Sequence, residues 1–227
     1  MELALSIESR DGRAEAAFPV ERLVIAGWAG RDRAAMEHHI AELEALGVRR
    51  PTALPTFYRV AAARLTRAAA IEPPGERSSG EAEAVLIARH GALFVGLGSD
   101  HTDRAAEAYD VTVSKQMCDK PVAGTVWPFA EVADHWDRLV LRSWMTVEGD
   151  RRLYQEGPVS GLLAPADLLS RYASDGRLPD GTAMFCGTLP AIGGIACGER
   201  FEAALEDPVL GRTIALAYDV VALPVAA

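Results

Sequence analysis

The chain has 227 residues, which is enough for one sizeable hydrophobic core or for two small domains. Hydrophobic residues make up 49% of it and charged residues 24%, a balance typical of a folded globular protein and not of a disordered one. The net charge of −9, with no basic stripe to offset it, argues against nucleic-acid binding.

The sequence also lacks the patterns of membrane and secreted proteins. It has no run of about 18 apolar residues that would predict a membrane span, and its first residues show no secretory signal pattern. Three separated cysteines with no CxxC motif predict reduced thiols. We therefore expect a cytoplasmic protein without membrane contact.

Residues 1–75 are predicted to form a small N-terminal α/β region. Short strands are expected over residues 3–8 and 22–26. Apolar residues then recur at helical spacing over residues 31–47, which predicts a helix that we expect to act as a lid. A second helical stretch is expected over residues 59–70.

Residues 76–227 are predicted to form a larger core in which strands dominate, and no internal repeat is visible. The expected elements after an acidic hairpin are strands over residues 138–147, 151–155, 182–187 and 213–223 and a short helix over residues 165–174. The two regions together predict an α+β fold.

The acidic hairpin is predicted by two apolar runs of strand length, residues 84–88 and 92–97. They flank His90-Gly91, a dipeptide suited to a two-residue turn. In such a hairpin the sequence numbers of two residues that lie opposite each other always add up to the same value, because one strand runs forward as the other runs back. A change of register by one residue would send every side chain of a strand to the opposite face.

Three carboxylates meet on one face of this hairpin in the predicted register. Glu81 lies opposite Asp100, and Glu83, two residues further along the strand, points to the same side. Three facing carboxylates repel each other unless a cation lies between them. The register therefore predicts a site for a divalent metal.

A histidine and a glutamate share one face of the helix predicted over residues 31–47. Glu42 follows His39 by three residues, so its carboxylate can orient the imidazole and raise its basicity. Such a pair is prepared for general-base catalysis. The alternative is an ordinary surface pair, and the neighbouring His38 lacks a glutamate at the same spacing.

The segment after the hairpin supplies a cation close to the predicted metal site. Arg104 has the fork geometry to bind a substrate carboxylate in a bidentate manner. The alternative is a structural arginine paired with Asp103 or Glu107. His101 is a further potential metal ligand, or a histidine that is simply hydrogen-bonded.

Two more segments offer groups that stabilise negative charge. Lys115 and Lys120 are the only lysines, and either one can stabilise an enolate or oxyanion beside a metal. Gly187 and Thr188 begin a glycine-rich turn whose amides and hydroxyl can bind an anion, although a turn without function explains it equally well.

In chain order, these motifs together resemble the fumarylacetoacetate hydrolase family, and they cover most of the chain. The segments that carry the resemblance are residues 39–42, 80–87, 100–104, 148–157 and 180–190. The chain departs from the family pattern at Leu189, which is inserted before Pro190, at Cys186 in place of a threonine, and at Glu148 in place of an asparagine. It therefore looks like a divergent branch of the family.

The resemblance implies a mixed β-roll or barrel core with a small N-terminal region, in a homodimer, and it implies that residues 76–227 are the catalytic core. It implies Mg²⁺ or Mn²⁺ as cofactor, with oxygen ligands. The implied metal ligands are Glu81, Glu83 and Asp100, the implied catalytic residues are His39, Glu42 and Lys115, and the implied substrate-binding residues are Arg104, Gly187, Thr188 and Gln155.

The function expected from the resemblance is metal-dependent hydrolysis of a C–C bond in a 1,3-dicarbonyl 2-oxo acid, such as an acylpyruvate. The same metal and enolate chemistry serves an oxaloacetate-type decarboxylase, an isomerase or a hydratase. A different alternative is a non-catalytic binder of a small carboxylate, which would need neither His39 nor a metal.

Overall fold

A computed structural model describes residues 1–45 and 50–226 of the chain. Within helix α1 (Arg33–Ala45) some side chains are outside the described part. They are those of Ala35, His38, His39, Glu42, Leu43 and Ala45. The predicted base His39 and its partner Glu42 are thus on a described helix, but their side chains lie outside the described residues.

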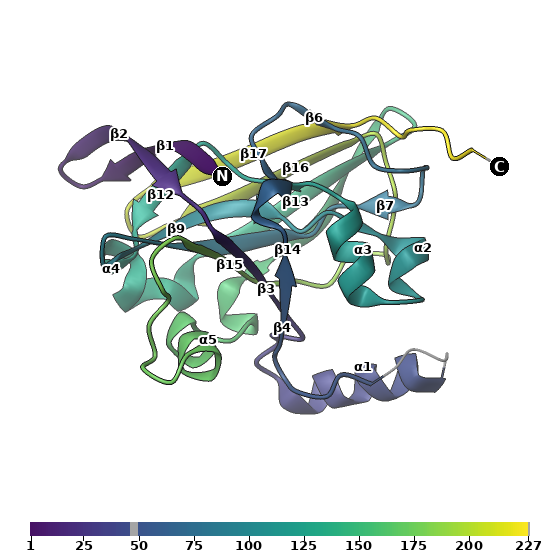
Figure 1. Cartoon of the computed structure of the whole chain (residues 1–227), viewed down its shortest axis with the longest axis horizontal. Helices are drawn as coiled ribbons and strands as arrows, with labels where there is room; N and C mark the ends of the chain where they lie inside the picture. The colour runs from purple at the N-terminus through teal and green to yellow at the C-terminus, as the bar shows by residue number, and fades with distance from the viewer. Residues whose placement is uncertain (46–49, 227) are drawn as a thin grey trace.

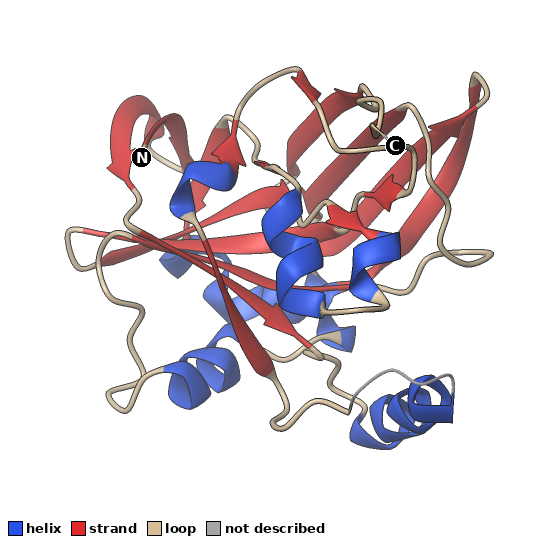
Figure 2. Ribbon diagram, turned by 45° about the vertical axis from the view of Figure 1, so that its right-hand side comes forward, coloured by secondary structure: helices blue, strands red, loops and turns tan. Residues whose placement is uncertain are grey.

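Most strands belong to two sheets that pack against each other (Figures 1 and 2). The larger has the order β2-β1-β12-β9-β8-β15-β3-β4 and the smaller the order β14-β13-β16-β17-β6. The larger sheet consists of β1 (Glu2–Ser9), β2 (Gly12–Pro19), β3 (Arg22–Gly27), β4 (Thr56–Val60), β8 (Ala82–Arg89), β9 (Ala92–Ser99), β12 (Thr125–Pro128) and β15 (Thr182–Thr188). The smaller consists of β6 (Ala70–Ile71), β13 (Val140–Val147), β14 (Asp150–Pro158), β16 (Arg200–Asp207) and β17 (Arg212–Val220).

Short strand pairs and helices complete the structure, and in Figure 2 the helices lie around the strands. The short strands are β5 (Leu65–Thr66) with β11 (Lys120–Pro121) and β7 (Ser78–Ser79) with β10 (Thr102–Asp103). The other helices are α2 (Arg104–Glu107), α3 (Val111–Met117), α4 (Phe129–Val132), α5 (Pro165–Tyr172), and the 3₁₀ turns Ala62–Arg64, Ala133–Arg138 and Val159–Gly161. Within the described ranges, no helix has the length and apolar character to cross a membrane.

The larger sheet buries side chains on both faces, because successive residues of a strand point to opposite sides. Leu86 of β8 points into a core shared with Phe201 of the smaller sheet. Val85 points the other way, into a second core with Phe185 of β15. Glu83 lies two residues before Val85 on the same strand, so its side chain points to the same face, the one that carries the second core.

The strands of residues 1–75 are hydrogen-bonded into the same sheets as strands from residues 76–227. β3 pairs with β15 in parallel, β1 pairs with β12, and β6 pairs with β17. The division of the chain near residue 75 stays a prediction. Helix α1 lies beyond the ends of β3 and β4, at the periphery of the molecule (Figure 1).

Most predicted elements are present within a few residues of their expected limits, and the predicted α+β architecture with a mixed β core is confirmed. The helix predicted over residues 59–70 is wrong. That stretch contains the end of β4, one 3₁₀ turn, β5 and the first residue of β6. Its alanines have high helix propensity, but the pairing of β4 with β3 outweighs this local preference.

Candidate functional site

The hairpin of β8 and β9 places the candidate site. His90 and Gly91 have φ angles of 50° and 73°, the positive values that a type I′ turn requires at both central residues. The amide of Asp100 donates to the carbonyl oxygen of Glu81 at 2.9 Å. The predicted register is therefore confirmed.

Glu81, Glu83 and Asp100 form a cluster of carboxylates. One oxygen of each lies within 4.8 Å of the others. Glu83 and Asp100 are 2% and 0% exposed, so little water reaches them. Carboxylate oxygens are the hard donors that Mg²⁺ and Mn²⁺ prefer to softer ligands, so this donor set fits either ion.

Two buried lysines contact Asp100 from different sides. Lys115 donates to Oδ2 of Asp100 and also lies 3.5 Å from Oε2 of Glu81. Nζ of Lys120 lies 3.0 Å from Oδ1 of Asp100 and forms an ion pair with it. The same Nζ donates its hydrogen bond to the carbonyl oxygen of His101. Burial opposes ionisation of Asp100, but the two ammonium groups lower its pKa.

Glu83 has the opposite electrostatic environment. Burial raises the pKa of its carboxyl group well above the usual value, and the charges of Asp100 and Glu81 raise it further. The amide of Gly187, which donates to Oε2 at 2.6 Å, opposes this shift. A cation among the three carboxylates would favour the ionised form of Glu83.

Arg104 holds Glu81 in place. Its Nη2 lies 3.1 Å from Oε1 of Glu81, its Nη1 lies 2.8 Å from Oε2 of Glu107, and its Nε donates to Oγ of Ser79 at 2.7 Å. Asp103 instead caps α2 by accepting from the amide of Ala106. Of the two structural partners considered for Arg104, Glu107 is the one observed, and binding of a substrate carboxylate stays a prediction.

Gln155 of β14 has all four hydrogen bonds of its amide satisfied within the chain. Its Oε1 accepts from the amide of Ala82 at 3.0 Å and from Oγ of Ser143 at 2.8 Å. Its Nε2 donates to Oγ1 of Thr188 at 2.7 Å and to the carbonyl oxygen of Leu189 at 2.6 Å. The inserted Leu189 thus supplies an acceptor, and Gln155 ties β8, β13 and the end of β15 together.

Replacement of Gln155 by leucine is expected to lower the free energy of unfolding by at least about 2 kcal/mol, because buried partners lose their hydrogen bonds. Denaturant unfolding monitored by circular dichroism measures the change. Gln116, the only other glutamine, accepts a single bond from the amide of Ala61. Its replacement by leucine is the control and should cost about 1 kcal/mol. Equal losses would contradict the bracing role of Gln155.

The predicted anion-binding turn binds a carboxylate of the chain itself. Gly187 has a φ of 94°, and a Cβ at this position would lie 2.7 Å from the Cβ of Ala29, so no other residue fits without a shift. Its amide donates to Glu83, as described above. Oγ1 of Thr188 donates to the carbonyl oxygen of Ala82 at 2.9 Å. The turn therefore positions β8, the strand that follows Glu81 and contains Glu83.

His101 is hydrogen-bonded through both ring nitrogens. Nδ1 lies 2.9 Å from Oη of Tyr218 and Nε2 lies 2.9 Å from Oγ of Ser78. Burial, with the charges of Lys120 and Arg104, lowers the pKa of His101 to about 3, so the ring is neutral. His101 is thus the hydrogen-bonded histidine of the two alternatives and lies outside the carboxylate cluster.

Sequence reasoning missed two supports of the site. Tyr218, which also contacts Oγ of Ser99 at 2.8 Å, is far from the hairpin in sequence and carries no motif. Gly80 is the residue before Glu81, and a Cβ there would lie 2.6 Å from Cδ2 of Phe201. A glycine next to the predicted metal ligand Glu81 is a signal for such close packing.

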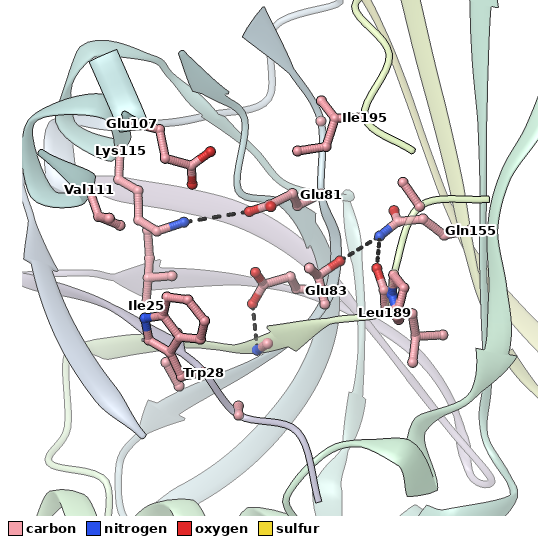
Figure 3. Close-up of a pocket in the computed structure, with 18 of the residues that line it drawn as sticks. Ile25, Trp28, Glu81, Glu83, Glu107, Val111, Lys115, Gln155, Leu189 and Ile195 are labelled. Atoms are coloured by element: carbon pink, nitrogen blue, oxygen red, sulfur yellow. Dashed lines mark hydrogen bonds and ion pairs between the residues drawn. The ribbon is translucent and has the colours of Figure 1, made fainter. Parts of the chain in front are cut away.

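Glu81 and Glu83 of the cluster line a cavity of about 580 Å³, while Asp100 is fully buried. Lys115 enters it from α3, which begins after the cap Asp110. Figure 3 shows Glu83 in the middle of this cavity, with Trp28 on one side and Ile195 on the other. The site thus combines a potential cation site, a buried ammonium group and space for an organic ligand.

Comparison with known proteins gives the family and the fold. A family model described as "Protein of unknown function (DUF2848)" matches residues 26–218. No curated protein matches the sequence significantly.

Solved structures share the fold at low sequence identity. A yeast protein of the fumarylacetoacetate hydrolase family, ynq8, is 16% identical with a TM-score of 0.64, over 91% of this chain and 95% of that one. A 2-keto-3-deoxy-D-arabinonate dehydratase complexed with magnesium and 2,5-dioxopentanoate is 15% identical with a TM-score of 0.63, over 94% and 78%. The 4-oxalocrotonate decarboxylase of Pseudomonas putida G7, complexed with calcium and acetate, is 15% identical with a TM-score of 0.51, over 88% and 76%.

These neighbours have the fold of the fumarylacetoacetate hydrolase family, as the sequence motifs imply. The family model covers most of the chain. This protein therefore belongs to the DUF2848 family, whose members are described as proteins of unknown function, and it has the fumarylacetoacetate hydrolase fold.

Proposed function

We propose that this chain is a divalent-metal-dependent enzyme of small 2-oxo acids, and that it hydrolyses a C–C bond in an acylpyruvate-like 1,3-dicarbonyl acid. The observation that carries the proposal is the cluster of Glu81, Glu83 and Asp100, which Lys115 contacts. Glu81, Glu83 and Lys115 line one cavity, and Asp100 is buried behind them. Fold neighbours that act on 2-oxo acids support it.

The three carboxylates would hold Mg²⁺ or Mn²⁺. A bound divalent cation supplies a Lewis acid that polarises a 2-oxo acid and favours its enolate form. Gly187 orients Glu83, and Arg104 orients Glu81, so both ligands are positioned before any cation binds. Such preorganisation is the main source of electrostatic stabilisation in enzymes.

Lys115 would stabilise negative charge that develops on the substrate oxygens. Its carboxylate neighbours raise the pKa of its ammonium group although burial opposes this, so the group stays protonated. A permanently charged donor in a site with little water contributes more than the same charge in solvent. This role needs no proton transfer by Lys115.

Hydrolysis additionally requires activation of a water molecule, and His39 with Glu42 on α1 is the proposed pair for this step. The second candidate, decarboxylation of an oxaloacetate-type acid, needs no such base. A fold neighbour that is a 4-oxalocrotonate decarboxylase supports this candidate, and the carboxylate cluster with Lys115 would serve it. Dehydration or isomerisation would use the same carboxylate cluster.

Replacement of His39 by alanine distinguishes the two candidates. If His39 activates water, hydrolysis of a panel of acylpyruvates with added Mg²⁺ should slow by about 10²–10⁴-fold, the usual value of general-base catalysis. The variant His38→Ala on the same helix is the control and should keep the activity.

The other outcomes are equally distinct. Unchanged hydrolysis in His39→Ala would contradict the role of His39. Release of CO₂ from oxaloacetate, with no cleavage of acylpyruvates, would favour the decarboxylase. If the protein bound these acids equally well after treatment with EDTA and turned none over, it would be a binder rather than an enzyme. The homodimer and the cytoplasmic location stay predictions.

A further inference from the structure

The groups expected to bind the polar part of a substrate are engaged within the chain. The nitrogens of Arg104 contact Glu81, Glu107 and Ser79. The side-chain amide of Gln155 donates two hydrogen bonds and accepts two. The hydroxyl group of Thr188 donates to the carbonyl oxygen of Ala82, and the backbone amide of Gly187 donates to Glu83. A ligand would have to displace these bonds before the groups could bind it.

The cavity wall beyond the carboxylates is largely apolar. Ile25 and Trp28 lie on one side of Glu83, and Val111 lies one helical turn before Lys115 (Figure 3). Trp28 has a φ of 59°, a left-handed conformation that is costly for a bulky residue and often marks a functional position. Its Nε1 donates to Oη of Tyr58 at 3.2 Å, so the indole has a defined position in this wall.

Ile195 closes the opposite side of the cavity although it is 61% exposed (Figure 3). Tyr154 anchors its loop at two points. The carbonyl oxygen of Tyr154 accepts from the amide of Ile192 at 2.7 Å, and its hydroxyl accepts from the amide of Ala196 at 3.3 Å. An isoleucine held in water at the wall of a cavity is suited to contact an apolar ligand group.

We propose that the acid bound here carries an apolar group of several carbon atoms beyond its oxo-acid head, and that Ile195 contacts this group. The inference rests on the proposed function, because the carboxylate cluster must bind the oxo-acid head. The cavity of about 580 Å³ lies within the range of about 300–1,000 Å³ that is usual for pockets of larger organic ligands.

Binding of oxamate and its N-ethyl, N-butyl and N-hexyl derivatives tests this inference. Oxamate is an unreactive chelator that resembles the head of a 2-oxo acid, so calorimetry with Mg²⁺ and the whole protein measures affinity without turnover. In the wild type each buried methylene should tighten binding by about fourfold, until the cavity is filled.

The variant Ile195→Asn should bind the N-hexyl derivative at least about fivefold more weakly than the wild type, because part of the apolar contact is lost. Its affinity for oxamate itself should change by less than about twofold. The matched control is Ile192→Asn. Ile192 is 54% exposed in the same loop but does not line the cavity, so the whole series should be unaffected.

Each result is decisive. Metal-dependent binding that does not increase with chain length, or equal effects of the two isoleucine variants, would overturn the inference and leave the proposed function intact. If no member of the series bound in a metal-dependent manner, the proposed function would fail and the inference with it.

Discussion

Replacement of Asp100 by asparagine is expected to destabilise the protein by about 3–5 kcal/mol, the usual cost of removing one partner of a buried ion pair. Asp100 is fully buried and lies between the ammonium groups of Lys115 and Lys120. Without the carboxylate, Lys120 has to keep an uncompensated charge in the interior or lose its proton. Denaturant unfolding at neutral pH measures the loss.

A second variant shows whether the loss arises from Lys120. The double variant Asp100→Asn, Lys120→Met removes the buried cation together with its partner, and it should recover about 1–3 kcal/mol relative to the single variant. It remains testable even if Asp100→Asn alone does not fold. A double variant no more stable than the single one would contradict the role of Asp100 as the counter-ion of Lys120.

Replacement of Glu83 by glutamine should have the opposite effect on the metal-free protein. The pKa of Glu83 is raised by burial and by the charges of Asp100 and Glu81, so the ionised form is unfavourable there. A neutral amide relieves this repulsion, and its oxygen can still accept from the amide of Gly187. We expect metal-free Glu83→Gln to be at least as stable as the wild type at pH 7.

The same substitution should abolish the response to metal. The wild type should gain about 2.7 kcal/mol of stability at a Mg²⁺ or Mn²⁺ concentration 100 times the Kd, whereas Glu83→Gln should gain nothing at that concentration. Its turnover of 2-oxo acids should be lost as well. Thermal unfolding with and without the ion measures the response.

Glu107 supplies the control for this experiment. It also lines the cavity, but it pairs with Arg104 and is outside the cluster of three carboxylates. Glu107→Gln should keep the stabilisation by metal. A variant of Glu83 that is stabilised by Mg²⁺ as much as the wild type would show that Glu83 is not a ligand.

The hairpin was predictable because its geometry is local. The apolar runs define two strands, and the two-residue turn between them fixes the register in which they pair. This register puts Glu81 opposite Asp100. No knowledge of the remaining chain is needed for this step. The same holds for α5, where Pro165 marks the first turn of a short helix.

The supports of the site were not predictable from local pattern. Tyr218, Ser143 and Phe201 come from strands of the smaller sheet, and only the packing of the two sheets brings them to the hairpin. Sequence patterns indicate which residue types can bind a substrate, but they do not show which hydrogen-bond partners those side chains already have within the chain. The resemblance implies that Arg104 and Gln155 bind substrate, which stays a prediction. In the structure their polar groups position Glu81 and β8.

The central claim is that Glu81, Glu83 and Asp100 together bind a divalent cation. Anomalous diffraction from crystals soaked with Mn²⁺ and oxalate tests it directly. We expect one strong peak with an oxygen of each carboxylate at about 2.0–2.3 Å from the ion, the usual range for such ligands. A cavity without a peak, or a peak bound by other residues, would contradict the claim.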